Sequence, residues 1–68
     1  MDANADEATD IAREGHRAYE RGDYDEARRL FRIAADHGNT WAQSWLGFMY
    51  EEGHGVGQDY GEALRLYR

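Results

Sequence analysis

The chain has 68 residues, of which 14 are acidic and 8 basic, giving a formal net charge of −6, and it contains no cysteine. Disulfide bonds and thiolate metal sites are therefore excluded, and the acidic balance argues against nucleic acid and anionic lipid as partners, because both require a basic surface. No apolar run approaches the roughly 20 residues of a membrane span and no signal peptide is recognisable, so we expect a soluble chain without membrane insertion, in a compartment that the sequence leaves open.

Start and stop signals divide the chain into four predicted helices, at about residues 5–21, 24–37, 41–52 and 60–68. The starts are residues that can cap a first turn and have Glu or Gln three places later: Asn4, Asp23, Thr40 and Asp59. The stops are glycines that can adopt the left-handed conformation: Gly22, Gly38 and Gly53. No segment alternates like a strand, so we predict an all-α fold.

Apolar residues recur at three- and four-residue spacing, which predicts a buried face on each helix. Small residues dominate that face in the first helix: Ala8, Ile11, Ala12, Gly15, Ala18 and Tyr19. The second helix carries a matching stripe: Ala27, Leu30, Phe31, Ala34 and Ala35. The third is apolar around most of its circumference: Trp41, Ala42, Trp45, Leu46, Phe48, Met49 and Tyr50. We expect it to be the central packing element, with Gly47 allowing a close neighbour.

An internal repeat links the two halves of the chain. Asp23-Tyr24-x-Glu26-Ala27 returns 36 residues later as Asp59-Tyr60-x-Glu62-Ala63, and Phe31 aligns with Tyr67. A period of this size is typical of solenoids, whose units bury their apolar faces against one another. We therefore predict a single α-helical repeat domain over 1–68, with an acidic lead-in at 1–7, a first unit at 8–38 and a truncated second unit at 39–68.

These motifs resemble a known repeat superfamily. Residues 22–27, with Gly15 before them and Phe31 after, resemble a tetratricopeptide repeat (TPR). The second unit resembles the related Sel1-like repeat (SLR) in several matched positions: Ala42-Gln43, Leu46-Gly47, Tyr50, the glycine-containing segment 53–58 and Asp59-Tyr60. The resemblance implies antiparallel helix pairs of an α-solenoid, stacked into a right-handed superhelix. It also implies that helix A, the first of each pair, lines a groove used in adaptor or scaffold roles.

Within that frame, groove residues are predicted from the inner face of each helix A: Thr9, Ala12, His16, Tyr19 and Glu20 in the first unit, and Trp41, Ser44, Phe48, Glu51 and Glu52 in the second. Two aromatic residues on one helical stripe, Trp41 and Phe48, can anchor an extended or helical peptide. The alternative is that both pack against the neighbouring helix or stabilise an oligomer.

The second unit ends at Arg68, before counterparts of Ala34, Ala35 and Gly38. This predicts an open apolar end at Leu64, Leu66 and Tyr67, which cannot all face inward. Two interpretations are open. The chain is a fragment of a longer array whose next helices were removed, or its open end pairs with a second copy or a partner protein. A structural capping or self-association segment of a longer array is kept as a further alternative for its function. Either interpretation predicts self-association at high concentration.

No catalytic, cofactor-binding or metal-binding residue is predicted. The three histidines, His16, His37 and His54, lie in different elements and lack the spacing of zinc sites. The glycines of segment 53–58 follow no strand, and no lysine or arginine lies among them to meet phosphate. We predict a non-enzymatic module for protein or peptide partners. The alternative from another class, a hydrolase of the cysteine-rich Sel1-like type, lacks the cysteines on which that resemblance depends.

Overall fold

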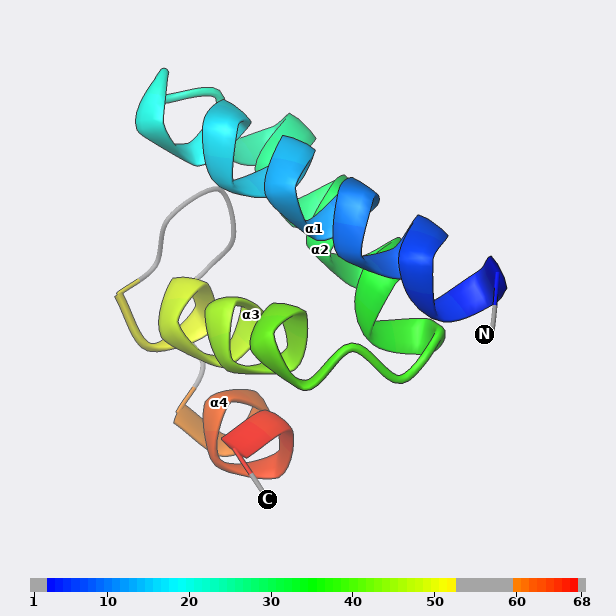
Figure 1. Cartoon of the computed structure of the whole chain (residues 1–68). Coiled ribbons are helices and arrows are strands. Elements are labelled where there is room, and N and C mark those ends of the chain that lie inside the picture. The colour runs from blue at the N-terminus through cyan, green and yellow to red at the C-terminus, as the bar shows by residue number, and fades with distance from the viewer. Residues whose placement is uncertain (1–2, 53–59, 68) are drawn as a thin grey trace.

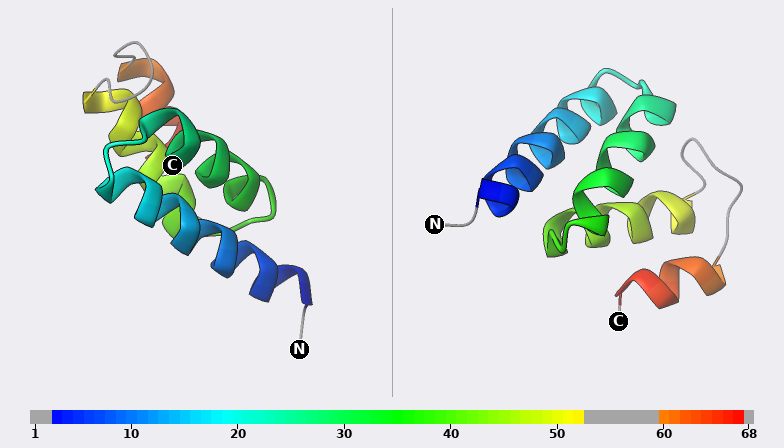
Figure 2. Two further views of the ribbon diagram at one scale, coloured as in Figure 1. Left: turned by 90° about the horizontal axis from the view of Figure 1, so that it is seen from above. Right: turned by 90° about the vertical axis from the view of Figure 1, so that its right-hand side faces the viewer.

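The computed structural model describes residues 3–52 and 60–67, which form four α-helices: α1 (Ala3–Glu20), α2 (Tyr24–Asp36), α3 (Thr40–Glu52) and α4 (Tyr60–Tyr67). Figure 1 shows α1 and α2 side by side as one pair, and α3 and α4 as a second. Because α2 also packs on α3, the helices follow one another in space as they do in sequence (Figure 2). The described residues contain no strand, and the predicted all-α solenoid of helix pairs is confirmed.

The two described connections between helices are closed in the same way. Gly22 and Gly38 have φ angles of 81° and 90°, in the left-handed region where an L side chain is strained. The N–H of the following residue, Asp23 or Asn39, donates to the carbonyl oxygen five residues earlier, at 2.9 Å and 3.1 Å. This closure satisfies the last carbonyl groups of α1 and α2. Both predicted glycine stops are confirmed.

The same two polar residues also begin the next helices. Asp23 caps α2, because its Oδ1 accepts the Glu26 N–H at 3.4 Å, as predicted. The cap of α3 is Asn39, whose Oδ1 accepts the Ala42 N–H at 2.7 Å. The prediction of Thr40 as the cap is therefore wrong: it is the first residue of the helix, and the preceding amide side chain reaches the free N–H groups.

At the N-terminal side, α1 begins at Ala3, so the predicted cap at Asn4 is also wrong. Alanine has the highest helix propensity, and Ala3 and Ala5 favour extension of the helix past the capping pattern. The remaining predicted start and stop, Asp59 and Gly53, lie outside the described residues.

The core consists mainly of small side chains from the predicted stripes. Among the residues that the structure describes, ten apolar ones are buried: Ala8, Ala12, Ala18, Ala27, Phe31, Ala34, Ala35, Ala42, Leu46 and Met49. Seven of them are alanines, which lets the helix backbones approach closely. Only Phe31, Leu46 and Met49 are large and fully enclosed among the described residues. Partly buried aromatic residues supply much of the remaining packing.

Each helix pair contains the same contact between a glycine and a ring. A Cβ atom added to Gly15 would lie 3.0 Å from the Phe31 ring, and one added to Gly47 would lie 2.9 Å from the Tyr67 ring. The two rings are 36 residues apart in sequence and the two glycines 32, since the second pair has a longer connection. The 36-residue repeat is thus a structural repeat, in which the first helix of each pair (helix A: α1 or α3) places a glycine under an aromatic residue of the second (helix B: α2 or α4).

Candidate functional site

Five rings from the two A helices gather in one cluster, which we call the aromatic face: His16 and Tyr19 of α1, and Trp41, Trp45 and Phe48 of α3. The His16 ring centroid lies 5.6 Å from that of Trp41 and 5.1 Å from that of Trp45. The Tyr19 ring lies 4.9 Å from Trp45 and 6.2 Å from Phe48. These contacts connect α1 to α3 directly, across the two repeat units.

Trp45 is the centre of this cluster. Its ring stacks on Phe31 at 5.5 Å with an interplanar angle of 3°. It meets Trp41 and Phe48 edge to face, at 6.1 Å and 5.7 Å. Such ring pairs contribute about 0.5–1.5 kcal/mol each beyond the area that they bury. Sequence reasoning missed Trp45 as a groove residue, although it lies four residues after Trp41 and three before Phe48, a helical spacing that places all three on one stripe.

The structure brings together four of the predicted groove residues, His16, Tyr19, Trp41 and Phe48. Trp41 is 46% exposed although it contacts three other rings. The other predicted positions lie around the cluster or away from it: Ser44, Glu20 and Glu52 are exposed, Glu51 is half-buried, and exposed Thr9 lines a separate cavity beside the connection between α2 and α3. Ala12 has no exposed surface, so its placement in the groove is wrong because it packs in the core.

Carboxylates surround the aromatic face. The Oε1 atom of Glu20 lies 3.2 Å from Nδ1 of His16, one helical turn earlier. The pKa of Tyr19 is raised, chiefly by burial of its hydroxyl and further by the nearby Tyr24 and Glu52 groups. Glu52 at the end of α3 therefore lies close enough to act on the end of α1. Glu20 and Glu52 thus give the aromatic face a negative border.

An apolar pocket lies between α3 and α4. This pocket, of about 310 Å³, is lined by Ser44, Trp45, Phe48 and Tyr67. The Tyr67 hydroxyl donates to Glu51 Oε2 at 2.9 Å, and the pKa of Tyr67 is raised by burial and then by this carboxylate. Tyr67 is 49% exposed, whereas Leu66 packs against the core. The side chain of Leu64, the third predicted residue of the open end, lies outside the described part of the structure.

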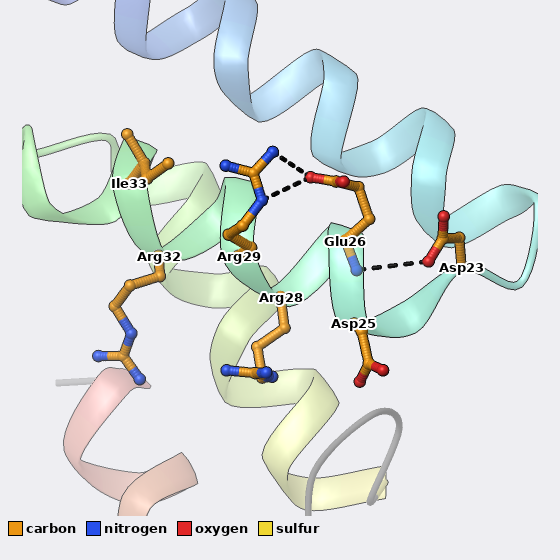
Figure 3. A pocket seen from close by; sticks show the side chains of 7 residues that line it. All are labelled: Asp23, Asp25, Glu26, Arg28, Arg29, Arg32 and Ile33. Atoms are coloured by element: carbon orange, nitrogen blue, oxygen red, sulfur yellow. Dashed lines mark hydrogen bonds and ion pairs between the residues drawn. The ribbon is translucent and has the colours of Figure 1, made fainter.

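A larger cavity, of about 580 Å³, lies on the polar side of α2 (Figure 3). Arg28 and Arg32 point to the same side, and the Arg32 Nη2 donates to the Tyr50 hydroxyl at 3.0 Å. Arg29 pairs instead with Glu26, through a 2.7 Å bond from its Nε. Three carboxylates line the same cavity as these three guanidinium groups, so its charges balance. We assign it as a charge-balanced surface of α2, joined to α3 by the hydrogen bond from Arg32 to Tyr50, and not as an anion site.

Two further observations concern the described residues alone. No three of their His, Asp and Glu side chains come close enough together to hold a metal ion. None of the described helices combines the length and the apolar character needed to cross a bilayer.

Comparison with known proteins gives a consistent result. The family model described as Sel1 repeat matches residues 12–39 and 42–68, which hold the second half of α1 with all of α2, and all but the first two residues of α3 with α4. The chain is also 40% identical over 58 residues to an exopolysaccharide production negative regulator of Rhizobium leguminosarum bv. viciae. That alignment covers 85% of this chain and 22% of the relative, so the chain spans about a fifth of the relative's length. No solved structure matches the chain. With both helix pairs matched by the family model, the chain belongs to the Sel1 repeat family.

Proposed function

We propose that this chain is a non-enzymatic protein-interaction module that binds a protein or peptide segment on the aromatic face of α1 and α3. The observation that carries the proposal is Trp41, which is 46% exposed and yet fixed by ring contacts with His16, Phe31 and Trp45. An exposed indole held in one position is a suitable anchor for a partner. Membership of the Sel1 repeat family, whose repeats mediate contacts between proteins, supports the same role.

The physical properties of this face favour binding. Its rings are held by one another, so little side-chain entropy is lost when a partner covers them. A tryptophan offers a large apolar area together with one N–H donor, which suits the centre of an interface. The border of Glu20 and Glu52 favours a segment with lysine or arginine beside its apolar anchor, because complementary charge guides association.

The bacterial relative suggests the setting in which such binding acts. Its name describes a negative regulator of exopolysaccharide production. Part of a regulator can act by holding another protein, and we propose that this chain serves a regulatory complex in that way. The hydrolase alternative has no observation in its favour, since the sequence contains no cysteine to carry that resemblance.

The proposal is tested by selecting peptides from a random library on the folded chain and measuring their affinity for variants. Trp41→Ala is expected to weaken binding at least about tenfold, as the loss of an aromatic anchor does. Its circular dichroism should remain that of the parent. Asp36→Ala, an exposed change on α2, is the matched control and should bind normally. A selection in which no peptide loses affinity for Trp41→Ala would contradict the proposal, and so would a selection that yields no peptide.

Trp45→Ala separates folding from binding. Trp45 stacks on the fully buried Phe31, so its loss should lower the free energy of unfolding by about 3 kcal/mol. Trp41→Ala should cost clearly less, because nearly half of Trp41 is already exposed. Equal losses of stability would show that Trp41 is a core residue and would favour the packing alternative.

A further inference from the structure

The pocket between α3 and α4 corresponds to a place that is filled in the first helix pair. The contacts of Gly15 with Phe31 and of Gly47 with Tyr67 align the two pairs, with α1 matching α3 after 32 residues and α2 matching α4 after 36. Under this alignment the pocket residues Phe48 and Tyr67 are the counterparts of His16 and Phe31. Ser44, which also lines the pocket, is the counterpart of Ala12.

In the first pair these positions hold the next helix. The His16 ring contacts Trp41 at 5.6 Å and Trp45 at 5.1 Å. Phe31 contacts the same two tryptophans at 6.3 Å and 5.5 Å. Trp41 and Trp45, four positions apart on α3, therefore lie between the His16 ring of α1 and the Phe31 ring of α2. Covered in this way, Phe31 has no exposed surface, whereas its counterpart Tyr67 is 49% exposed.

We propose that Ser44, Phe48 and Tyr67 form a docking seat for a helix of a partner protein that carries two aromatic residues four positions apart. This C-terminal seat rests on the proposed function as a protein-interaction module, but its anchoring contacts are made by Phe48 and Tyr67 and not by Trp41. The occupied seat in the first pair shows the shape that it accepts: one ring lying on Tyr67, and a second ring edge-on beside it.

The seat also specifies a charge on its partner. In the occupied seat, Tyr19 contacts Trp45 and, at 6.2 Å, Phe48, which lies seven residues after Trp41. The counterpart of Tyr19 in the second pair is Glu51. A residue seven positions after the first aromatic of the docking helix therefore faces a carboxylate. Lysine or arginine is preferred there, since opposite charges across an interface favour binding and register.

A second copy of this chain is less suited to the seat than such a partner. In the sequence, Trp41 and Trp45 are the only Trp, Tyr or Phe residues four positions apart, and they already occupy the seat of their own chain. Their counterparts on α1, the helix that a second copy would present, are Thr9 and Arg13. That pair has no ring to place on Tyr67.

The test uses the full chain and a designed helical peptide of about 18 residues, long enough to form a helix in water. The peptide carries two tryptophans four positions apart and an arginine three positions after the second. The control peptide has the same composition with its tryptophans two positions apart, on opposite sides of the helix. The designed peptide should bind at least about tenfold more tightly than the control. Replacing its arginine by glutamate should weaken binding to the parent chain more than to Glu51→Gln.

Variants of the chain locate the binding. Ser44→Arg, which fills the pocket, and Tyr67→Ala, which removes one wall, should each weaken binding at least about tenfold. Thr40→Arg places the same charge on an exposed position of the same helix outside the pocket and should bind like the parent. Equal binding of both peptides, or binding unaffected by Ser44→Arg, would overturn the proposal. Self-association in sedimentation that Ser44→Arg abolishes, without peptide binding, would show a second copy in the seat and overturn it too.

The seat shares Phe48 with the aromatic face, but Trp41 belongs to the aromatic face alone and Tyr67 to the seat alone, so variants at these two residues test the two proposals separately. Trp41→Ala should keep its affinity for the designed peptide while it loses peptides selected for the aromatic face. If the designed peptide does not bind the seat, Trp41→Ala should still weaken the binding of the selected peptides. If Trp41→Ala does not weaken that binding, Tyr67→Ala should still weaken the binding of the designed peptide.

Discussion

The ring of Tyr67 lies so close to Gly47 that a Cβ atom on the glycine would stand 2.9 Å from Tyr67 Cε1. Phe31 lies on Gly15 in the same manner, with Cδ1 and Cε1 both at 3.0 Å. The two rings differ in their freedom to move, because Phe31 is fully buried and Tyr67 is half-exposed. A methyl group at Gly47 can push its ring outward, but one at Gly15 has to displace the core.

Gly15→Ala should therefore lower the free energy of unfolding, and Gly47→Ala should change it little. Overpacking costs about 1–3 kcal/mol, against which alanine gains roughly 1 kcal/mol of helix propensity. We expect a net loss of about 1 kcal/mol at Gly15 and less than about 0.5 kcal/mol at Gly47, measured by urea unfolding. The double variant Gly15→Ala with Phe31→Leu should lose less than the sum of the two single changes. Simple additivity would mean that the ring is not the source of the strain.

Separate replacement of Asn39 and Thr40 should show which of the two residues caps α3. Asn39→Ala removes the acceptor of the Ala42 N–H and should cost about 1 kcal/mol of stability. Thr40→Ala should stay within about 0.5 kcal/mol of the parent, because exposed positions tolerate change and alanine favours helix. Thermal unfolding followed by circular dichroism measures both. A larger loss at Thr40 than at Asn39 would contradict the cap seen in the structure.

The two glycines with positive φ angles should discriminate between mirror-image residues. No atom lies within 4 Å of a Cβ built on Gly22 or Gly38, so only the backbone conformation limits substitution. L-alanine at either position should cost about 1–2 kcal/mol. D-alanine, which favours positive φ, should raise stability by about 0.4–1 kcal/mol, because it restricts the unfolded chain. The chain is short enough for chemical synthesis of both forms. Equal stability of the L- and D-variants would disagree with the φ angles.

Ionisation of Tyr67 should detach α4 in alkaline solution. Burial, and then the Glu51 carboxylate, raises the pKa of Tyr67 above its ordinary value of 10.0, because both disfavour the charged phenolate. The folded state therefore favours the neutral form of Tyr67. The stability that Tyr67 contributes is fully present below about pH 10, and it is lost as the pH rises through the higher pKa that Tyr67 has in the folded state. Tyr67→Phe lacks this ionisation, and the helical signal of α4 should be less sensitive to pH in that variant. Tyrosinate absorbance and circular dichroism, followed together from neutral to alkaline pH, measure the effect.

Glu51→Gln provides the control for that titration. It keeps the side-chain volume and removes the charge, so the pKa of Tyr67 should fall toward its ordinary value while the ring stays on Gly47. An unchanged titration in Glu51→Gln would show that the carboxylate does not act on the phenol.

Local signals in the sequence predicted the architecture well, because glycine stops, the Asp23 cap and the apolar stripes depend on neighbours within one turn. The choice between Asn39 and Thr40 was missed, since both can cap and the preceding helix end at Gly38 decides which one reaches the free N–H groups. Trp45 was missed for a different reason. Helical spacing places both Ser44 and Trp45 near Trp41, and only the position of α1 shows which one meets its rings. The extent of the binding surface and the division into units at residue 38 remain predictions.

Asp23 and Asn39 each end one helix with a backbone N–H and begin the next with a side-chain oxygen. The connection within the first unit and the connection between units are therefore the same joint, built from glycine and one short polar residue. In mechanical terms, no loose linker separates α1, α2 and α3. A pull along the chain meets cap hydrogen bonds at each joint before it reaches the apolar core, so these joints should be the first points to yield under force, and the stiffness of the segment should depend on them.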